Sequence, residues 1–164
     1  MKTLLILRHA KSSWKHPELA DHDRPLNKRG KRDARRMGEL LKQEDLVPGL
    51  ILSSSARRAL KTAEAVAQSS GYENEIHVVT TFYHAGLESF YKAIARSPDQ
   101  FTQIMIIGHN PGLEVFFEDV TGYWERLPTA ALAQIKLPIN RWVEFDDHIE
   151  GTLKNLWLPR ELLD

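Results

Sequence analysis

Two residues that could handle a phosphate group follow the first apolar run of the chain. Residues 4–7 (Leu-Leu-Ile-Leu) lead directly into Arg8 and His9. The planar guanidinium of an arginine presents N–H donors that match a phosphate or a carboxylate. A histidine can act as a nucleophile or as an acid–base group near neutral pH. The pair indicates an oxyanion site, with phosphate as the favoured ligand, or else a strand that simply ends in solvated polar residues.

Two later stretches repeat this pattern. Residues 103–107 (Gln-Ile-Met-Ile-Ile) include another apolar run, which is followed by Gly108 and His109. Residues 50–52 lead into a serine turn and then into a predicted helix with Arg57 and Arg58 in its first turn. The start of a helix already favours anions, so an arginine there suggests that an anion offsets its charge.

These side chains can meet only if strands and helices alternate. A run of branched aliphatic residues such as 4–7 suits a strand that is buried on both faces. Strands are predicted at residues 4–7, 50–52, 76–79, 103–107, 131–137, 142–145 and 152–158. Helices are predicted to begin at Lys28 with Asn27 as cap, after a Ser54 or Ser55 cap, at Leu87, and after Pro111. The alternation implies a three-layer α/β/α sandwich with a mostly parallel central sheet. Ligands bind such sheets beyond the carboxyl ends of the strands.

Composition limits the classes of function. The 164 residues favour one domain, 1–164, and 42% hydrophobic with 27% charged residues is typical of a globular protein. The net charge of zero argues against nucleic-acid binding by bulk charge. The absence of cysteine excludes thiol catalysis and disulfides. No apolar stretch approaches the roughly 18 residues of a membrane span, and residues 4–7 are too short for a signal peptide, so a cytoplasmic protein is expected.

One helix carries a concentration of positive charge. Six of the residues from 28 to 36 are lysine or arginine. Such a face is ordinarily exposed to solvent, and the alternative is that it steers anionic substrates towards the protein.

Three motifs of the chain resemble those of the histidine phosphatase superfamily, which includes phosphoglycerate mutases and acid phosphatases. They are residues 7–10 (Leu-Arg-His-Ala), 54–63 (Ser-Ser-Ala-Arg-Arg-Ala-Leu-Lys-Thr-Ala) and 108–111 (Gly-His-Asn-Pro). The loop 21–26 (Asp-His-Asp-Arg-Pro-Leu), Arg29-Gly30 and residues 128–130 (Pro-Thr-Ala) further resemble the bacterial phosphohistidine phosphatase (SixA-type) branch. The resemblance spans nearly the whole chain and implies a phosphoglycerate-mutase-like fold.

The resemblance also implies roles for the motif residues. His9 would be the nucleophile and would carry a phosphohistidine intermediate that water then hydrolyses. Arg8, Arg58 and His109 would bind the phosphoryl oxygens, with Arg58 preferred to its neighbour Arg57. Two arginines and a protonated histidine would supply the positive charge, so neither a metal nor another cofactor is expected.

The general acid is the open role. Larger members of the superfamily use a carboxylate between the second and third motifs, where this chain offers Glu73, Glu75, His84 and Glu88 but lacks the extended acidic motif. An imidazole leaving from phosphohistidine has a pKa near neutrality and needs less help from an acid than an alkoxide does. His84 is the preferred acid or phosphate contact, and the alternative is a structural role at its turn.

The substrate expected from these observations is phosphohistidine on a protein in a signalling or phosphorelay system. Short segments between the motifs leave little material for a lid, which favours a side chain that projects from a folded protein. The alternatives are a phosphatase for a sugar or nucleotide phosphate, a mutase, and a non-catalytic phosphate-binding module. Arg24 either reaches the phosphate or is held by Asp21 and Asp23 in its loop. The other histidines lack the spacing of zinc ligands, so no metal site is predicted.

Overall fold

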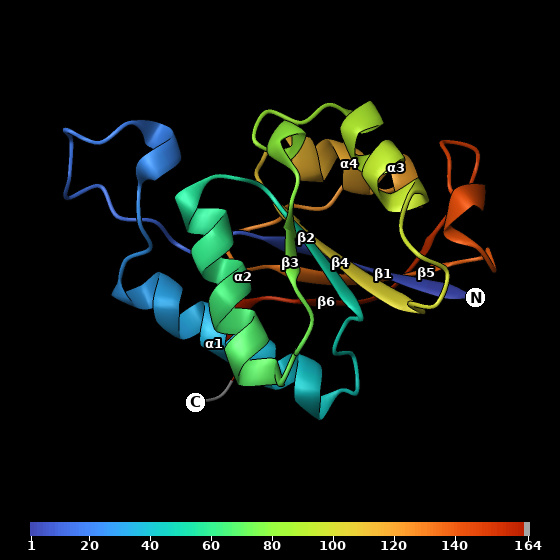
Figure 1. The fold of residues 1–164 in the computed structure, drawn as a ribbon, viewed down its shortest axis with the longest axis horizontal. Coiled ribbons are helices and arrows are strands. Elements are labelled where there is room, and N and C mark those ends of the chain that lie inside the picture. Colours follow the sequence, from blue (N-terminus) through green and yellow to red (C-terminus); the bar gives the residue numbers. More distant parts are fainter. Residues whose placement is uncertain (163–164) are drawn as a thin grey trace.

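The computed structural model describes residues 1–162, which are organised around one six-stranded sheet (Figure 1). The strands are β1 (Lys2–Arg8), β2 (Leu50–Ser53), β3 (Ile76–Val78), β4 (Gln103–Gly108), β5 (Leu132–Leu137) and β6 (Thr152–Trp157). Their order in the sheet is β3-β2-β4-β1-β5-β6. The first four in the chain run parallel, whereas β5 is antiparallel to β1 and β6 is antiparallel to β5. The mostly parallel sheet is therefore confirmed.

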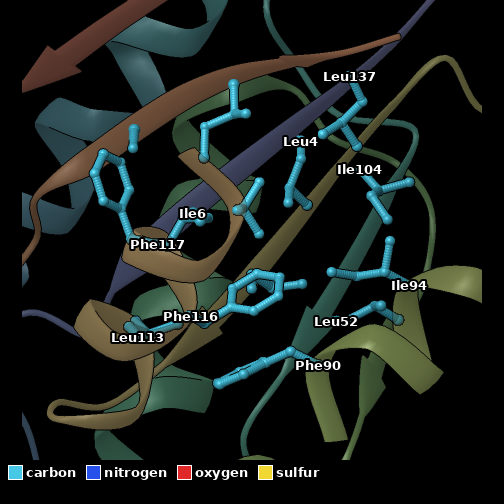
Figure 2. Packing of buried hydrophobic residues seen from close by; sticks show 14 of the residues in the cluster. Leu4, Ile6, Leu52, Phe90, Ile94, Ile104, Leu113, Phe116, Phe117 and Leu137 are labelled. Atoms are coloured by element: carbon cyan, nitrogen blue, oxygen red, sulfur yellow. The ribbon is translucent and has the colours of Figure 1, made fainter. Parts of the chain in front are cut away.

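Helices cover both faces of this sheet. The helices α1 (Lys28–Gln43) and α2 (Arg57–Ser70) lie on one face, and α3 (Leu87–Ala95) and α4 (Gly112–Thr121) lie on the other (Figure 1). The strand β1 serves both layers, because Leu5 and Leu7 pack in the core beneath α1 and α2 while Leu4 and Ile6 pack beneath α3 and α4. Figure 2 shows the second of these cores, with Phe116 and Phe117 of α4 beside β1. This is the expected three-layer α/β/α sandwich.

The shorter helical turns are η1 (Asp21–Asp23), η2 (Thr80–Phe82), η3 (Trp142–Glu144) and η4 (Pro159–Glu161). The prediction of a strand at residues 142–145 is wrong, since η3 lies there. The backbone N–H of Trp142 donates to Asp99 Oδ1 (2.8 Å), and that of Arg141 donates to Glu144 Oε1 (2.9 Å). Because side chains occupy these donors, they are not available to a neighbouring strand.

The helices α1 and α2 begin in different ways. Asn27 caps α1, as predicted, and its side chain accepts a hydrogen bond from the N–H of Gly30 (2.8 Å). Gly30 is required there because a Cβ atom would lie 2.1 Å from the carbonyl oxygen of Lys11. The predicted serine cap of α2 is wrong: its N-cap is Ala56, which makes no side-chain cap bond. Ser54 and Ser55 instead contact His109 and His22.

Three strand ends converge at one edge of the sheet. The N–H of His9, just after β1, donates to Gly108 O at the end of β4 (3.1 Å). The N–H of Ser54, just after β2, donates to Ile107 O (3.0 Å). The backbone is therefore hydrogen-bonded beyond the ends of the strands, and this edge is a rigid platform for the side chains that follow.

Candidate active site

His9 is buried, and its ring has a fixed orientation. Its Nδ1 atom lies 2.8 Å from the carbonyl oxygen of Ala10, the acceptor that the sequence could not identify. A carbonyl oxygen only accepts, so Nδ1 carries the proton and Nε2 keeps its lone pair. Burial lowers the pKa of His9 to about 3, and the charges of His109, Arg58 and Arg8 act in the same direction. The ring is therefore neutral at physiological pH, which is the state that a nucleophilic histidine needs.

The acceptor of His9 is itself held by Thr62 of α2. The N–H of Ala10 donates to Thr62 Oγ1 (2.9 Å), and the same hydroxyl donates to the carbonyl oxygen of Arg58 (2.7 Å). Thr62 thus connects the end of β1 to the first turn of α2. Sequence reasoning missed this residue, although it belongs to the second motif and lies four positions after Arg58, one helical turn along α2.

His109 faces His9 and has a different hydrogen-bond environment. The two ring centroids lie 5.0 Å apart. His109 Nε2 is hydrogen-bonded to Ser54 Oγ (2.7 Å), while its buried Nδ1 atom has no partner. Burial lowers the pKa of His109 to about 4, with the charge of Arg58 acting in the same direction and that of Asp21 opposing it. A pKa near 4 favours the neutral ring at pH 7, and protonation of His109 beside a phosphoryl group stays a prediction.

The two candidate arginines of α2 are clearly different. Arg58 is buried, with Nη1 donating to the carbonyl oxygen of Asp21 (2.7 Å) and Nη2 donating to Asp21 Oδ2 (3.0 Å). Arg57 is exposed, and its Nη1 donates to the carbonyl oxygen of Asp23 at 3.4 Å. The structure brings Arg58, rather than Arg57, to the histidines, as the resemblance implied.

Arg8 is held from the side opposite α2. Its Nη1 donates to Leu127 O (3.0 Å), and the side chain of Asn110 donates to the same oxygen (2.8 Å). Its Nε atom is buried without a partner, as is Nδ1 of His109. A buried polar atom without a partner costs about 1–3 kcal/mol. Phosphate oxygens would accept hydrogen bonds from Arg8 Nε, and from His109 Nδ1 in the tautomer in which Ser54 Oγ donates to Nε2, so the orphaned atoms fit an oxyanion ligand.

Asp21 connects the loop 11–26 to the site. Its carboxylate accepts hydrogen bonds from the hydroxyl of Tyr83 (2.6 Å), Nη1 of Arg24 (2.9 Å) and Nη2 of Arg58 (3.0 Å). The Tyr83 hydroxyl and the two guanidinium groups hold the pKa of Asp21 well below its usual range. The same hydrogen bond raises the pKa of Tyr83. Asp21 is therefore ionised and orients Arg58. Sequence reasoning did not identify these contacts with Arg58 and Tyr83.

Arg24 is buried, and its side chain forms hydrogen bonds with other residues of the loop 11–26. Nε donates to Ser13 O (3.2 Å), and Nη2 is hydrogen-bonded to Ser12 Oγ. Its guanidinium carbon lies 3.3 Å from the ring centroid of Trp14. With Nη1 on Asp21, each of its nitrogens has a partner. The structure therefore places Arg24 as a support for Asp21, and direct contact with phosphate stays a prediction.

His84 lies on the same rim as the buried histidine pair. Its ring centroid is 4.2 Å from that of Tyr83, which in turn is 5.6 Å from that of His109. His84 and His109 both line a hollow of about 320 Å³ that no described Asp or Glu lines. Glu73 and Glu75 precede β3 and so lie towards the opposite edge of the sheet. His84 is thus placed to act on a ligand, and its role stays a prediction.

Residues 1–162 contain neither a metal site nor a membrane-spanning helix. No group of three or more His, Asp or Glu side chains there is arranged to hold a metal ion. No helix in that range is long and apolar enough to cross a membrane. The cytoplasmic location and the metal-free reaction stay predictions.

Comparison with known proteins gives consistent matches. A model of the histidine phosphatase superfamily (branch 1) matches residues 4–82. A chloroplast protein of Arabidopsis thaliana is 35% identical over an alignment of 152 positions, which covers 87% of this chain and 70% of that protein. A structure from Agrobacterium tumefaciens that bears the name phosphohistidine phosphatase SixA is 27% identical, with a TM-score of 0.82 over 96% of this chain and 98% of that one.

A second solved structure agrees in fold. The protein histidine phosphatase SixA in complex with tungstate has a TM-score of 0.83 and 20% identity, over 96% of this chain and 97% of that one. The two chains share the architecture that brings two strand-end histidines and an arginine of α2 together here. From its motifs, its fold and its relatives, the chain belongs to the histidine phosphatase superfamily.

Proposed function

We propose that this phosphatase hydrolyses phosphohistidine on another protein and that His9 accepts the phosphoryl group. The observation that carries the proposal is the state of His9, whose Nδ1 donates to Ala10 O (2.8 Å) and whose pKa is lowered to about 3. Its Nε2 lone pair is therefore available at neutral pH beside a second histidine and buried arginine nitrogens.

The proposed reaction has two displacement steps. His9 Nε2 forms a bond to phosphorus while the bond from phosphorus to the substrate imidazole breaks, and that imidazole takes up a proton. Water then attacks phosphorus and loses a proton to solvent, which releases inorganic phosphate and the neutral His9 ring. Arg8, Arg58 and Nδ1 of His109 bind the phosphoryl oxygens in both steps, and such positioning and charge stabilisation dominate phosphoryl transfer.

The groups around the site favour a good leaving group. An alkoxide needs a proton donor, and general acid catalysis contributes about 10²–10⁴-fold. Asp21, the carboxylate that contacts Arg58, is held ionised by the donors around it and cannot serve as that donor. The hollow beside His109 holds His84 but no described carboxyl group. Because an imidazole leaves with a pKa near neutrality, phosphohistidine suits this site better than an alkyl phosphate.

The accessibility of the rim supports a protein substrate. The side chains of Asp21 and His84, on either side of Tyr83, are exposed. A phosphorylated side chain of a neighbouring protein would meet the site at this exposed rim. The structural relatives named SixA also support this substrate class, because one of them is described as a protein histidine phosphatase.

The experiment compares a phosphohistidine peptide with alkyl and aryl phosphates in the presence of a chelator. We expect turnover of the peptide and the aryl phosphate, and little turnover of alkyl phosphates. Rapid quenching in alkali, where phosphohistidine is stable, should trap a phosphoryl group on the wild-type protein but not on His9→Ala. Hydrolysis of sugar phosphates with no turnover of the peptide would instead support the small-molecule alternative.

The variant His84→Ala tests the leaving-group argument within the same experiment. It should slow residual alkyl phosphate hydrolysis far more than phosphohistidine hydrolysis, because only the alkoxide depends strongly on a proton donor. The matched control is His148→Ala, since His148 is exposed and lies outside the hollow that His84 lines. Equal losses on the two substrates would contradict the argument.

A further inference from the structure

Positive and negative charges are separated along this neutral chain. Residues 1–61 contain 15 of the 22 lysines and arginines but only 7 of the 22 acidic residues. That part of the chain forms β1, α1, β2 and the start of α2, whereas α3 and α4 come from the acidic remainder. The helices α1 and α2 cover one face of the sheet and α3 and α4 cover the other (Figure 1). From the residues that these helices carry, the first face is more basic and the opposite face more acidic.

A hollow of about 380 Å³ lies in the basic face, between α1, α2 and the end of the loop 11–26. The cations that line it are Lys31, Arg57 and Lys61, all of them exposed. Its apolar part comes from Pro25, Leu26 and Ala65. Glu64 and Gln68 complete the lining, which keeps a net positive charge. Cations around an apolar patch can hold acidic side chains together with part of a peptide backbone.

Two of these cations lack an internal counter-charge. Lys61 pairs with Glu64 (3.0 Å), whereas Lys31 and Arg57 make no ion pair within residues 1–162. Other basic residues of α1 differ in this respect: Arg29 pairs with the buried Asp33 (3.5 Å), and Arg35 pairs with Glu39 (2.8 Å). Lys28 and Lys42 of α1 likewise make no ion pair within residues 1–162, so uncompensated charge extends along this face and the hollow contains two of these cations.

The hollow adjoins the catalytic edge. Arg57 precedes Arg58 in the chain, and Pro25 follows Arg24. Arg24 and Arg58 both contact the carboxylate of Asp21. A protein whose phosphorylated side chain reaches His9 would therefore bring its neighbouring surface over these residues.

We propose that this hollow is a docking surface for acidic residues that flank the phosphohistidine of a protein substrate. The inference rests on the proposed function and adds the charge of the partner to it. A nucleic acid fits less well, because the acidic face repels an extended polyanion and the net charge is zero. A membrane is flat, whereas the cations here surround a concave patch.

The test uses three synthetic peptides, each with one phosphohistidine flanked on both sides by glutamates, by lysines or by serines. The wild-type protein should prefer the glutamate peptide to the lysine peptide about tenfold in kcat/KM, because exposed charge pairs each contribute a few-fold and act mainly at encounter. High salt should weaken this preference.

The variant Lys31→Glu/Arg57→Glu/Lys61→Glu should reverse the preference. The ratio of the two peptides within each protein cancels any general change in activity, and urea unfolding shows whether the variant is folded. The matched control is Lys92→Glu/Arg96→Glu/Lys154→Glu, which changes the same number of exposed charges outside the hollow and should keep the wild-type ratio.

Each remaining outcome contradicts a definite part of the proposal. Equal turnover of all three peptides by the wild-type protein would overturn the docking surface but not the phosphohistidine activity. A preference that persists in the triple variant would do the same. Turnover of an aryl phosphate but of none of the peptides would overturn the proposed function and the docking surface together. Equal turnover of the peptides, combined with oligonucleotide or anionic vesicle binding that the variant loses, would assign the hollow to that class of ligand.

Discussion

The ends of β1 and β4 each present a histidine to the same site, yet the two rings are held in opposite ways. The partner of His9 is the carbonyl oxygen of the next residue, so one nitrogen is fixed by the local backbone and the other is left for chemistry. The partner of His109 is the Ser54 side chain from the end of a different strand, and its second nitrogen is buried without a partner. The two histidines thus lie side by side on one rim, where one can act as the nucleophile and the other can bind the oxyanion. Their hydrogen bonds, rather than their positions, give them these different roles.

The largest expected effect is the loss of activity when each of the two histidines is replaced, and the loss should differ between them. His9→Ala should lower kcat by roughly 10⁴-fold or more, as removal of a nucleophile does, and should abolish the trapped phosphoenzyme. His109→Ala should lower kcat by about 10²–10³-fold, the loss typical of one oxyanion donor, and should still form the phosphoenzyme slowly. Alkaline-quench trapping on both variants checks this. A phosphoenzyme that persists in His9→Ala but is lost in His109→Ala would reverse the assignment.

Both rings should also make stability depend on pH. Each has a pKa that is lowered from 6.5 in the folded protein, to about 3 for His9 and about 4 for His109. The unfolded chain therefore binds more protons below pH 6.5, so full stability is present above that pH and is lost as the pH falls towards 4. The loss approaches about 1.4 kcal/mol per pH unit for each histidine.

Urea unfolding at several pH values between 7 and 4 measures this loss. The variants His9→Gln and His109→Gln should each remove part of the slope, and His148→Gln at an exposed position should leave it unchanged. A slope that neither buried substitution alters would show that the two rings are not held neutral by the fold.

The smallest expected effect concerns the partners of the rings. Ser54→Ala removes the hydrogen bond to His109 and should lower kcat/KM for an aryl phosphate about tenfold, because a buried nitrogen loses its partner. No substitution can remove the carbonyl partner of His9 in this way. Ser55→Ala is the matched control, since Ser55 contacts the half-buried His22 instead. Equal kcat/KM values for the two serine variants would show that Ser54 does not contribute to the site.

Much of the fold and part of the site could be predicted from the sequence, because the signals are local. The unbroken aliphatic runs of β1 and β4 predicted strands buried on both faces, and parallel pairing then placed His9 and His109 at one edge. The position of Arg58 after a strand and a turn predicted that its guanidinium would reach that edge. These inferences need only periodicity and the direction of the strands.

The missed features depend on contacts between residues far apart in the chain. Asp21 and Tyr83 are separated by 62 positions, and their hydrogen bond has no signature in either segment. Ser54 has the composition of a helix cap, but its proximity to His109 follows from the packing of β2 beside β4. The turn η3 replaces a strand because Asp99, 43 positions earlier, takes the N–H of Trp142. Side-chain partners of this kind are selected by tertiary packing, which local propensity does not encode.

The separation of charge between the two helical layers has a consequence for concentrated solutions. With equal numbers of acidic and basic residues, the molecule has no net charge to keep its copies apart. The basic face of one copy attracts the acidic face of the next, and such head-to-tail contacts join different surfaces and need not close into a ring. Dissolved salt shortens the range of this attraction to about 10 Å at an ionic strength of 0.1 M. The protein is therefore expected to be more soluble in moderate salt than in dilute buffer.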